Sequence, residues 1–157
     1  MRTLKNMSRT IAIAIGMLLM LSMTIGSAAA ANLNEETITG TGTLRAAGSG
    51  TAQIEGSGQV IIHRGFGEAY VSGADSIDIV GQGNQEVLDD GTVRLQGIAG
   101  NVTIRGANLS IEITGNRIAF RADGRGTVTL EGRGVYDANG INGRWTEEGV
   151  TLPIESQ

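Results

Sequence analysis

Apolar and polar residues alternate with a period of two along the chain from Thr51 onward. "TAQIE" places Ala52 and Ile54 on one side, and "TVTLE" places Val128 and Leu130 there, with polar residues between them. Successive side chains of a β-strand point to opposite faces, so each segment has one apolar and one polar face. The alternation therefore predicts an all-β fold. The residues predicted to face inward are Ala52, Ile54, Val60, Ile62, Ala69, Val71, Ile77, Ile79, Val93, Leu95, Val102, Ile104, Leu109, Ile111, Ile113, Ile118, Phe120, Ala122, Val128 and Leu130.

Glycine-containing stretches separate these segments at the lengths of hairpin turns. Two residues lie between inward positions at Gly106-Ala107, Gly115-Asn116 and Gly132-Arg133, and glycine stands where a type II′ turn needs a positive φ. A turn at Gly115-Asn116 sets Ile113 against Ile118. Apolar residues then meet on one face, which stabilises a sheet.

These segments and turns predict a Gly-rich up-and-down antiparallel meander of about 10–12 short strands that curls into a barrel or flattened barrel, preceded by an N-terminal signal-peptide helix. The alternative is a β-solenoid, because units of about eight to ten residues with small inward side chains suit one. The glycine-serine-glycine phrases resemble the Gly-rich β-helices of some bacterial adhesin-like surface proteins. The phrase "GSGTAQIEGSG" (48–58) returns as "GRGTVTLEGRG" (124–134), which indicates either an old duplication or a shared hairpin solution.

The first 31 residues have the three parts of a secretory signal peptide. A basic start is followed by the apolar run Ile11–Ile25 and by "GSAAAAN", where we expect cleavage after Ala30 or Ala31. This predicts an exported protein of the periplasm, cell surface or extracellular space, with a single all-β domain at 32–157. The alternative is an uncleaved anchor, in which case only residues 11–25 would enter a membrane.

The charge of residues 32–157 narrows the partners. Nine arginines and sixteen acidic residues give this region a net charge of −7, and its sequence contains no lysine. Nucleic acid and anionic membrane surfaces repel such a protein, so we expect no nucleic-acid partner. A homo-oligomer or a partner at the cell envelope or surface remains compatible with this charge. The chain has no cysteine, which excludes disulfides and thiolate metal sites.

Catalytic motifs are missing from this sequence. The stretch "GQGNQE" lacks the third glycine of a dinucleotide-binding turn, and the sole histidine, His63, cannot form a histidine cluster for zinc. We therefore predict no catalytic residue, no cofactor and no metal site. Asn101 and Asn108 each begin a glycosylation acceptor motif at a predicted turn.

Five residues form a predicted surface contact patch. A turn through residues 64–67 sets His63 opposite Glu68 and Ile61 opposite Tyr70, and the following turn places Asp78 beside Tyr70. Exposed apolar groups often mark partner sites. The alternative is an ordinary aromatic–β-branched pair that stabilises the sheet.

Trp145, the only tryptophan, is predicted to plug an end of the core and is also the candidate aromatic contact for a ligand. Together these features predict an exported non-enzymatic cell-envelope or extracellular protein with a structural, adhesive or assembly role. The alternative is a β module that binds a small ligand or a glycan, and a hydrolase ranks last.

Overall fold

The computed structural model describes residues 41–155, with positions 64–66 described by their backbone alone. These residues form one antiparallel sheet of five strands. The strands are β1 (Gly42–Ser72), β2 (Ser76–Val87), β3 (Val93–Ala138), β4 (Ile141–Arg144) and β5 (Val150–Pro153). The predicted all-β class is confirmed, whereas the predicted signal peptide, residues 1–31, lies outside the described residues.

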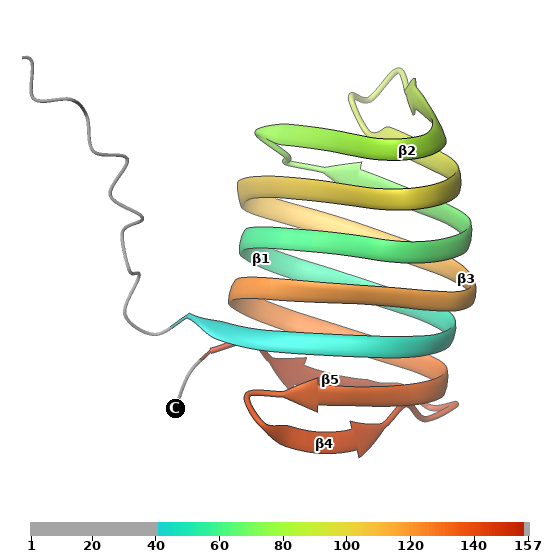
Figure 1. Cartoon of the computed structure of the whole chain (residues 1–157). Helices are drawn as coiled ribbons and strands as arrows, with labels where there is room; N and C mark the ends of the chain where they lie inside the picture. The colour runs from blue at the N-terminus through green and yellow to red at the C-terminus, as the bar shows by residue number, and fades with distance from the viewer. Residues whose placement is uncertain (1–40, 156–157) are drawn as a thin grey trace, which may run out of the picture. The chain divides into compact units, whose positions relative to one another are not determined.

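Two strands are very long because β1 and β3 wind together as a flattened coil (Figure 1). Most residues of β1 pair with two residues of β3, which belong to successive turns of the coil. Ala52, for example, lies between Ile113 and Leu130, which are 17 residues apart in the sequence. Neighbouring rows run antiparallel, so each inner row is hydrogen-bonded on both sides.

The predicted meander of short strands is wrong, and the sheet does not close into a barrel. Gly106, Gly115 and Gly132 lie inside β3, so the three predicted two-residue turns do not exist. Stacked turns are a feature of the solenoid alternative. Adjacent rows alternate in direction here, however, and one turn takes 17 residues rather than about eight to ten.

The coil has two walls with the core between them. Wall A faces the viewer in Figure 1, and wall B lies behind it. Wall A consists of residues 43–48, 59–63, 76–82, 101–106, 118–123, 134–138 and 141–144. Wall B consists of residues 51–55, 68–72, 84–87, 93–96, 109–114, 127–131 and 150–153.

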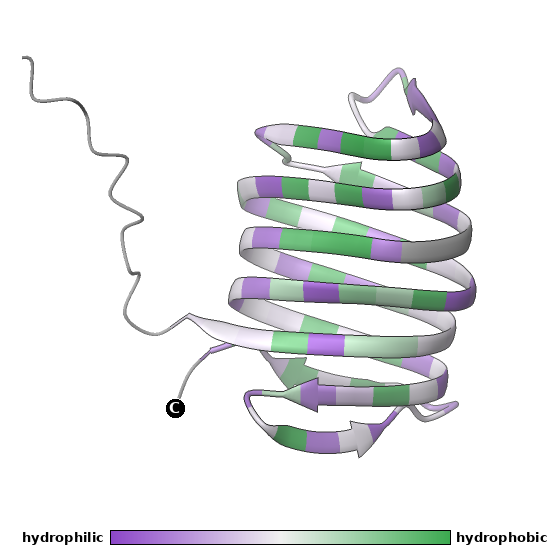
Figure 2. Cartoon of the chain, in the orientation of Figure 1, coloured by the Kyte–Doolittle hydropathy of each residue, from purple (hydrophilic) through white to green (hydrophobic). Residues whose placement is uncertain are grey.

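The core contains the residues that the alternation predicts to face inward. All of them are buried except Ile77, Ile79 and Val93, which pack half-buried against the others. Figure 2 shows the alternation as green and pale or purple bands along each ribbon. The predicted inward face is therefore confirmed.

The predicted pairing of Ile113 with Ile118 is wrong. Ile113 lies between Ala52 and Ala69 of β1, which belong to successive turns. Every inward position of a period-two segment offers an apolar partner, so many registers satisfy the alternation equally well.

Glycines let the long strands bend at the corners between the walls. Gly50 lies between Gly115 and Gly132 on the neighbouring rows, so three glycines stack at one corner. Its φ is 139°, and a Cβ there would overlap the carbonyl oxygen of Glu131. Only glycine combines this backbone angle with such a close approach of the next row. The bend thus occurs without interrupting the strand.

The two similar phrases of the sequence are partners in the sheet. Residues 48–58 pair antiparallel with residues 124–134, with Gly48 opposite Gly134 and Gly58 opposite Gly124. The spacing of glycines in each phrase reads the same in both directions. An antiparallel pairing therefore brings glycine onto glycine at both corners and apolar residues together between them.

The two ends of the coil differ. The capped end consists of β4, β5 and Trp145; both strands have four residues, and Pro153 lies in β5. Trp145 is 5% exposed, and its indole N–H donates to the carbonyl of Val135 at 3.2 Å. The open end is the twelve-residue β2, whose only strand partner among residues 41–155 is β3.

Candidate functional site

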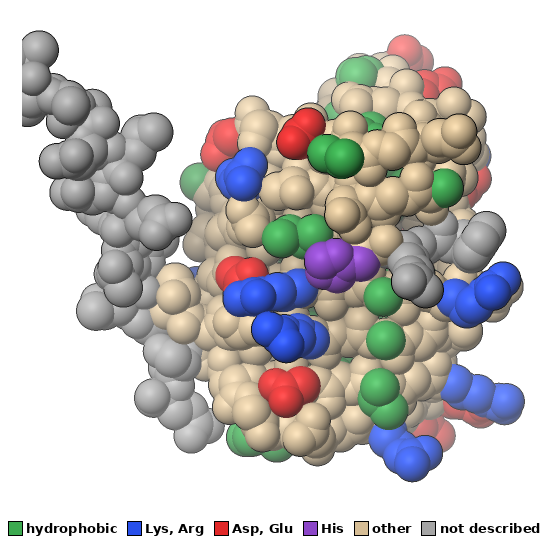
Figure 3. Space-filling model, in the orientation of Figure 1, with side chains coloured by type: hydrophobic (Ala, Val, Ile, Leu, Met, Phe, Trp, Pro, Cys, Tyr) green, Lys and Arg blue, Asp and Glu red, His purple; other side chains and the backbone are tan. Residues whose placement is uncertain are grey.

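A groove with a volume of about 800 Å³ lies on the outer face of wall A. Small apolar side chains line part of it, where Ala47 lies between Ala119 and Val135 on adjacent rows. Polar and charged residues around them are contributed by β1, β3 and β4. In Figure 3 the histidine, His63, lies in the middle of this face, with blue arginine side chains below it.

Three arginines line the groove: Arg45 of β1, Arg121 of β3 and Arg144 of β4. Arg45 lies directly opposite Arg121 on the next row. Like charges directly opposite each other destabilise a sheet, so local stability does not explain this pair. Residues that break a local rule of this kind are often functional.

Arg121 has a partner of its own. Its Nε and Nη2 atoms donate to Asp123 Oδ1 at 2.9 and 2.8 Å, and Thr43 Oγ1 donates to the same oxygen at 2.8 Å. The hydrogen bond to Asp123 raises the pKa of Arg121. Asp123 thus fixes the orientation of this guanidinium while leaving its Nη1 donors unused by that carboxylate.

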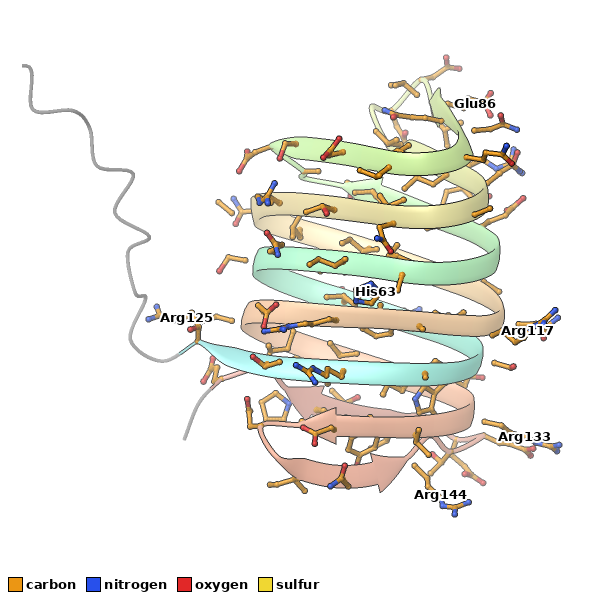
Figure 4. The ribbon with its side chains drawn as sticks, in the orientation of Figure 1. His63, Glu86, Arg117, Arg125, Arg133 and Arg144 are labelled. Carbon is orange, nitrogen blue, oxygen red and sulfur yellow. The ribbon has the colours of Figure 1, made fainter. Side chains whose placement is uncertain are left out.

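Arg45 and Arg144 are different. Both are exposed, and their side chains make no hydrogen bond or ion pair with the described residues. Asp137 lies opposite Arg45 in the register, but its Oδ1 accepts the N–H of Gly140 at 3.0 Å. Figure 4 shows Arg144 at the capped end and His63 on the β1 row. The groove therefore presents cationic groups that the protein does not neutralise.

The predicted contact patch is divided between the two walls. Ile61, His63 and Asp78 lie on wall A, whereas Glu68 and Tyr70 lie on wall B. The predicted registers are wrong because the strand continues round a corner, at residue 67, instead of folding back on itself.

The structure gives these residues other neighbours. Ile61 and His63 line the groove, and Ile61 lies opposite Arg121 and Thr103. Asp78 lies opposite Thr103 on the other side of that row.

Glu68 on wall B is the centre of a hydrogen-bonded cluster. It forms a salt bridge with Arg94, and it accepts hydrogen bonds from Gln96 Nε2 at 2.7 Å and from the Tyr70 hydroxyl at 2.9 Å. These three donors, Arg94 first, lower the pKa of Glu68, and the bond to Glu68 raises the pKa of Tyr70. A carboxylate held ionised by three donors is a weak base, so the cluster is better suited to stabilising the sheet than to proton transfer.

Arg94 extends this cluster to β2. Its Nη1 lies 3.7 Å from Glu86 Oε2, and its guanidinium lies 6.0 Å from the centre of the Tyr70 ring. Wall B thus pairs its arginine with two carboxylates, whereas Arg45 and Arg144 on wall A have no such partner among the described residues.

Trp145 lies in the core at the capped end rather than on the groove. Its ring packs over Gly48 and Gly134, which face each other at a corner. The predicted ligand contact would require this ring to become accessible.

Metal ligands and membrane-spanning helices were also sought. Among residues 41–155, no group of three or more histidine, cysteine, aspartate or glutamate side chains is placed to hold a metal ion. The described part of the chain likewise contains no helix with the length and apolar character that a membrane crossing requires.

Comparison with known proteins finds no matching family model, no matching curated protein and no matching solved structure. The site residues therefore rest on this chain alone. Sequence reasoning missed the arginines of the groove. The alternation of Leu44 and Ala46 on either side of Arg45 is a signal that could have placed that arginine on an outer face.

Proposed function

We propose that this chain is an exported, non-enzymatic structural protein that assembles with further copies of itself through β2. The observation that carries this proposal is the open end of the coil. β2 has twelve residues and pairs with β3 along one side. Its other side presents backbone N–H and C=O groups, which is the template for pairing with another chain.

The side chains of β2 do not obstruct such pairing. Val80 and Val87 are each 65% exposed, and β2 contains neither proline nor lysine. Natural sheets protect free edges with charges, proline or very short strands. The capped end has two of these features, since β4 and β5 are short and Pro153 lies in β5.

The expected arrangement is a two-fold dimer in which the two β2 strands pair antiparallel, continuing the alternation of rows. A register centred on Val80 places it opposite the partner's Val80 and Asp78 opposite the partner's Gln82. Exposed apolar surface becomes buried, and each Asp78 avoids the like charge of its copy.

Export and the absence of catalysis come from the sequence, through the signal-like residues 1–31 and the lack of catalytic motifs. The cluster around Glu68 supports the second point, because its carboxylate is occupied by three donors.

Light scattering coupled to size-exclusion chromatography tests the proposal. The protein should elute with at least twice the mass of one chain, and Val80→Lys should convert it to a monomer with an unchanged melting temperature. Ile141→Lys is the matched control, because Ile141 is 64% exposed but lies at the capped end. A monomeric wild-type protein at every concentration, or a Val80→Lys variant that stays assembled, would contradict the proposal.

A further inference from the structure

We propose that the groove on wall A binds an acidic polysaccharide through the carboxylates of its sugars. The groove is distinct from the β2 edge, so this inference does not depend on assembly. It assigns Arg45, Arg121 and Arg144 as the residues that recognise the acid groups.

The first argument is charge. Three arginines and one acidic residue, Asp137, line the groove, although residues 32–157 together carry a net charge of −7. A positive site on a negative protein selects anionic ligands locally, while the rest of the surface repels large polyanions such as nucleic acid.

The second argument is the state of the guanidinium groups. Arg45 and Arg144 are exposed and have no side-chain partner within the described residues, so their donors are available. Arg121 is held in place by Asp123. A planar guanidinium binds a carboxylate with two parallel hydrogen bonds, which favours carboxylates over a diffuse attraction to charge.

The third argument is the shape of the groove. Ala47, Ala119 and Val135 provide a shallow apolar surface between Arg45 and Arg144. Arg45 and Arg144 are separated by two row spacings, or about 10 Å across the sheet. A ligand that reaches both must carry at least two acid groups on an extended backbone, and the apolar faces of sugar rings can lie against the small side chains between them.

Isothermal titration with alginate oligosaccharides, which carry a carboxylate on every sugar, tests the inference on the protein as purified from its producing cell. We expect saturable binding that weakens as salt increases. Arg45→Gln and Arg144→Gln should each weaken it about tenfold, because each removes charge-assisted hydrogen bonds.

Arg105→Gln is the matched control. Arg105 lies on wall A outside the groove, where its Nε donates to Gln59 at 2.8 Å, and its substitution removes the same charge. Binding in this variant should be unchanged. An equal loss of affinity in Arg105→Gln would show nonspecific attraction and overturn the inference.

Further ligands and one assembly variant separate the remaining outcomes. Neutral dextran should not bind, and dextran sulfate should bind more weakly than alginate; the opposite order, or no alginate binding at low salt, would overturn the inference. The Val80→Lys variant should bind alginate as the wild type does. Failure of the assembly proposal and failure of the groove proposal are thereby distinguishable.

Discussion

The capped and open ends of the coil protect the sheet to different extents. Every terminal row of a sheet has unpaired backbone groups. At the capped end these rows are four residues long, and Trp145 and Ile154 close the core beside them. At the open end the terminal row is twelve residues long, and Ile77 and Ile79 are only half-buried.

This difference indicates that the two ends have different roles. The capped end completes the core, so its residues should determine the stability of the monomer. The open end leaves apolar surface and a strand edge accessible, so its residues should determine association instead. Substitutions at the two ends can therefore separate stability from assembly.

The largest expected effect is at the capped end. Trp145→Ala should lower the free energy of unfolding by about 3–5 kcal/mol, because it removes a buried ring that packs over two glycines and leaves a cavity. Urea denaturation measures this loss. Val87→Ala at the open end is the control and should change stability by less than about 0.5 kcal/mol, since Val87 is 65% exposed. Equal losses in the two variants would remove the distinction between the ends.

A smaller effect is expected from one glycine at each end. A Cβ on Gly143 of β4 would overlap the ring of Tyr136, so Gly143→Ala should destabilise the protein by about 1–3 kcal/mol. A Cβ on Gly83 of β2 would meet its nearest atoms at 3.8 Å, and neither glycine has a left-handed φ. Gly83→Ala should therefore be neutral or stabilising by up to about 1 kcal/mol. Denaturation midpoints of the two variants decide the matter, and a reversed order would show that the Tyr136 contact is unimportant.

The smallest effect concerns pH. Glu68 has a lowered pKa in the folded protein, so its contribution to stability is present above the pKa of an unfolded glutamate and is lost as the pH falls through the folded pKa. Wild-type stability should therefore decrease between neutral pH and about pH 3 more than that of Glu68→Gln. Tyr70→Phe, which removes one of the three donors, should lie between them. Identical pH profiles for wild type and Glu68→Gln would show that the cluster contributes nothing.

The inward residues were predictable because the alternation of side chains is a local property of a strand. Ala52, Ile54, Val128 and Leu130 are all buried, as their positions in two similar phrases require. The turns were not predictable in the same way. A glycine pair such as Gly106-Ala107 is compatible with a hairpin and with a bend in a continuous strand, and the two differ only in what the chain meets next.

One true hairpin was missed. Asn139 and Gly140 have φ values of 53° and 84° and connect β3 to β4, with Ala138 opposite Ile141. Asn-Gly is the strongest short signal for a two-residue turn, because both positions tolerate a positive φ. The signal was present, but the alternation around it is too weak to draw attention to a strand of four residues.

The groove could be anticipated only in part. Arg45 and Arg121 occupy outer positions beside inward residues, which the sequence shows. Their direct opposition depends on the pairing of rows that are 76 residues apart in the sequence. Local hairpins would have placed them on unrelated parts of the sheet.

The amino-acid sequence determined that the chain forms strands and which side of each strand faces the core, because both follow from the geometry of a few neighbouring residues. The tertiary structure decided which rows pair, which side chains share a wall and which edge stays open. Those outcomes depend on backbone hydrogen bonds and packing summed over a whole turn of the coil, where every inward position offers an equally apolar partner and the matched glycine corners favour one register.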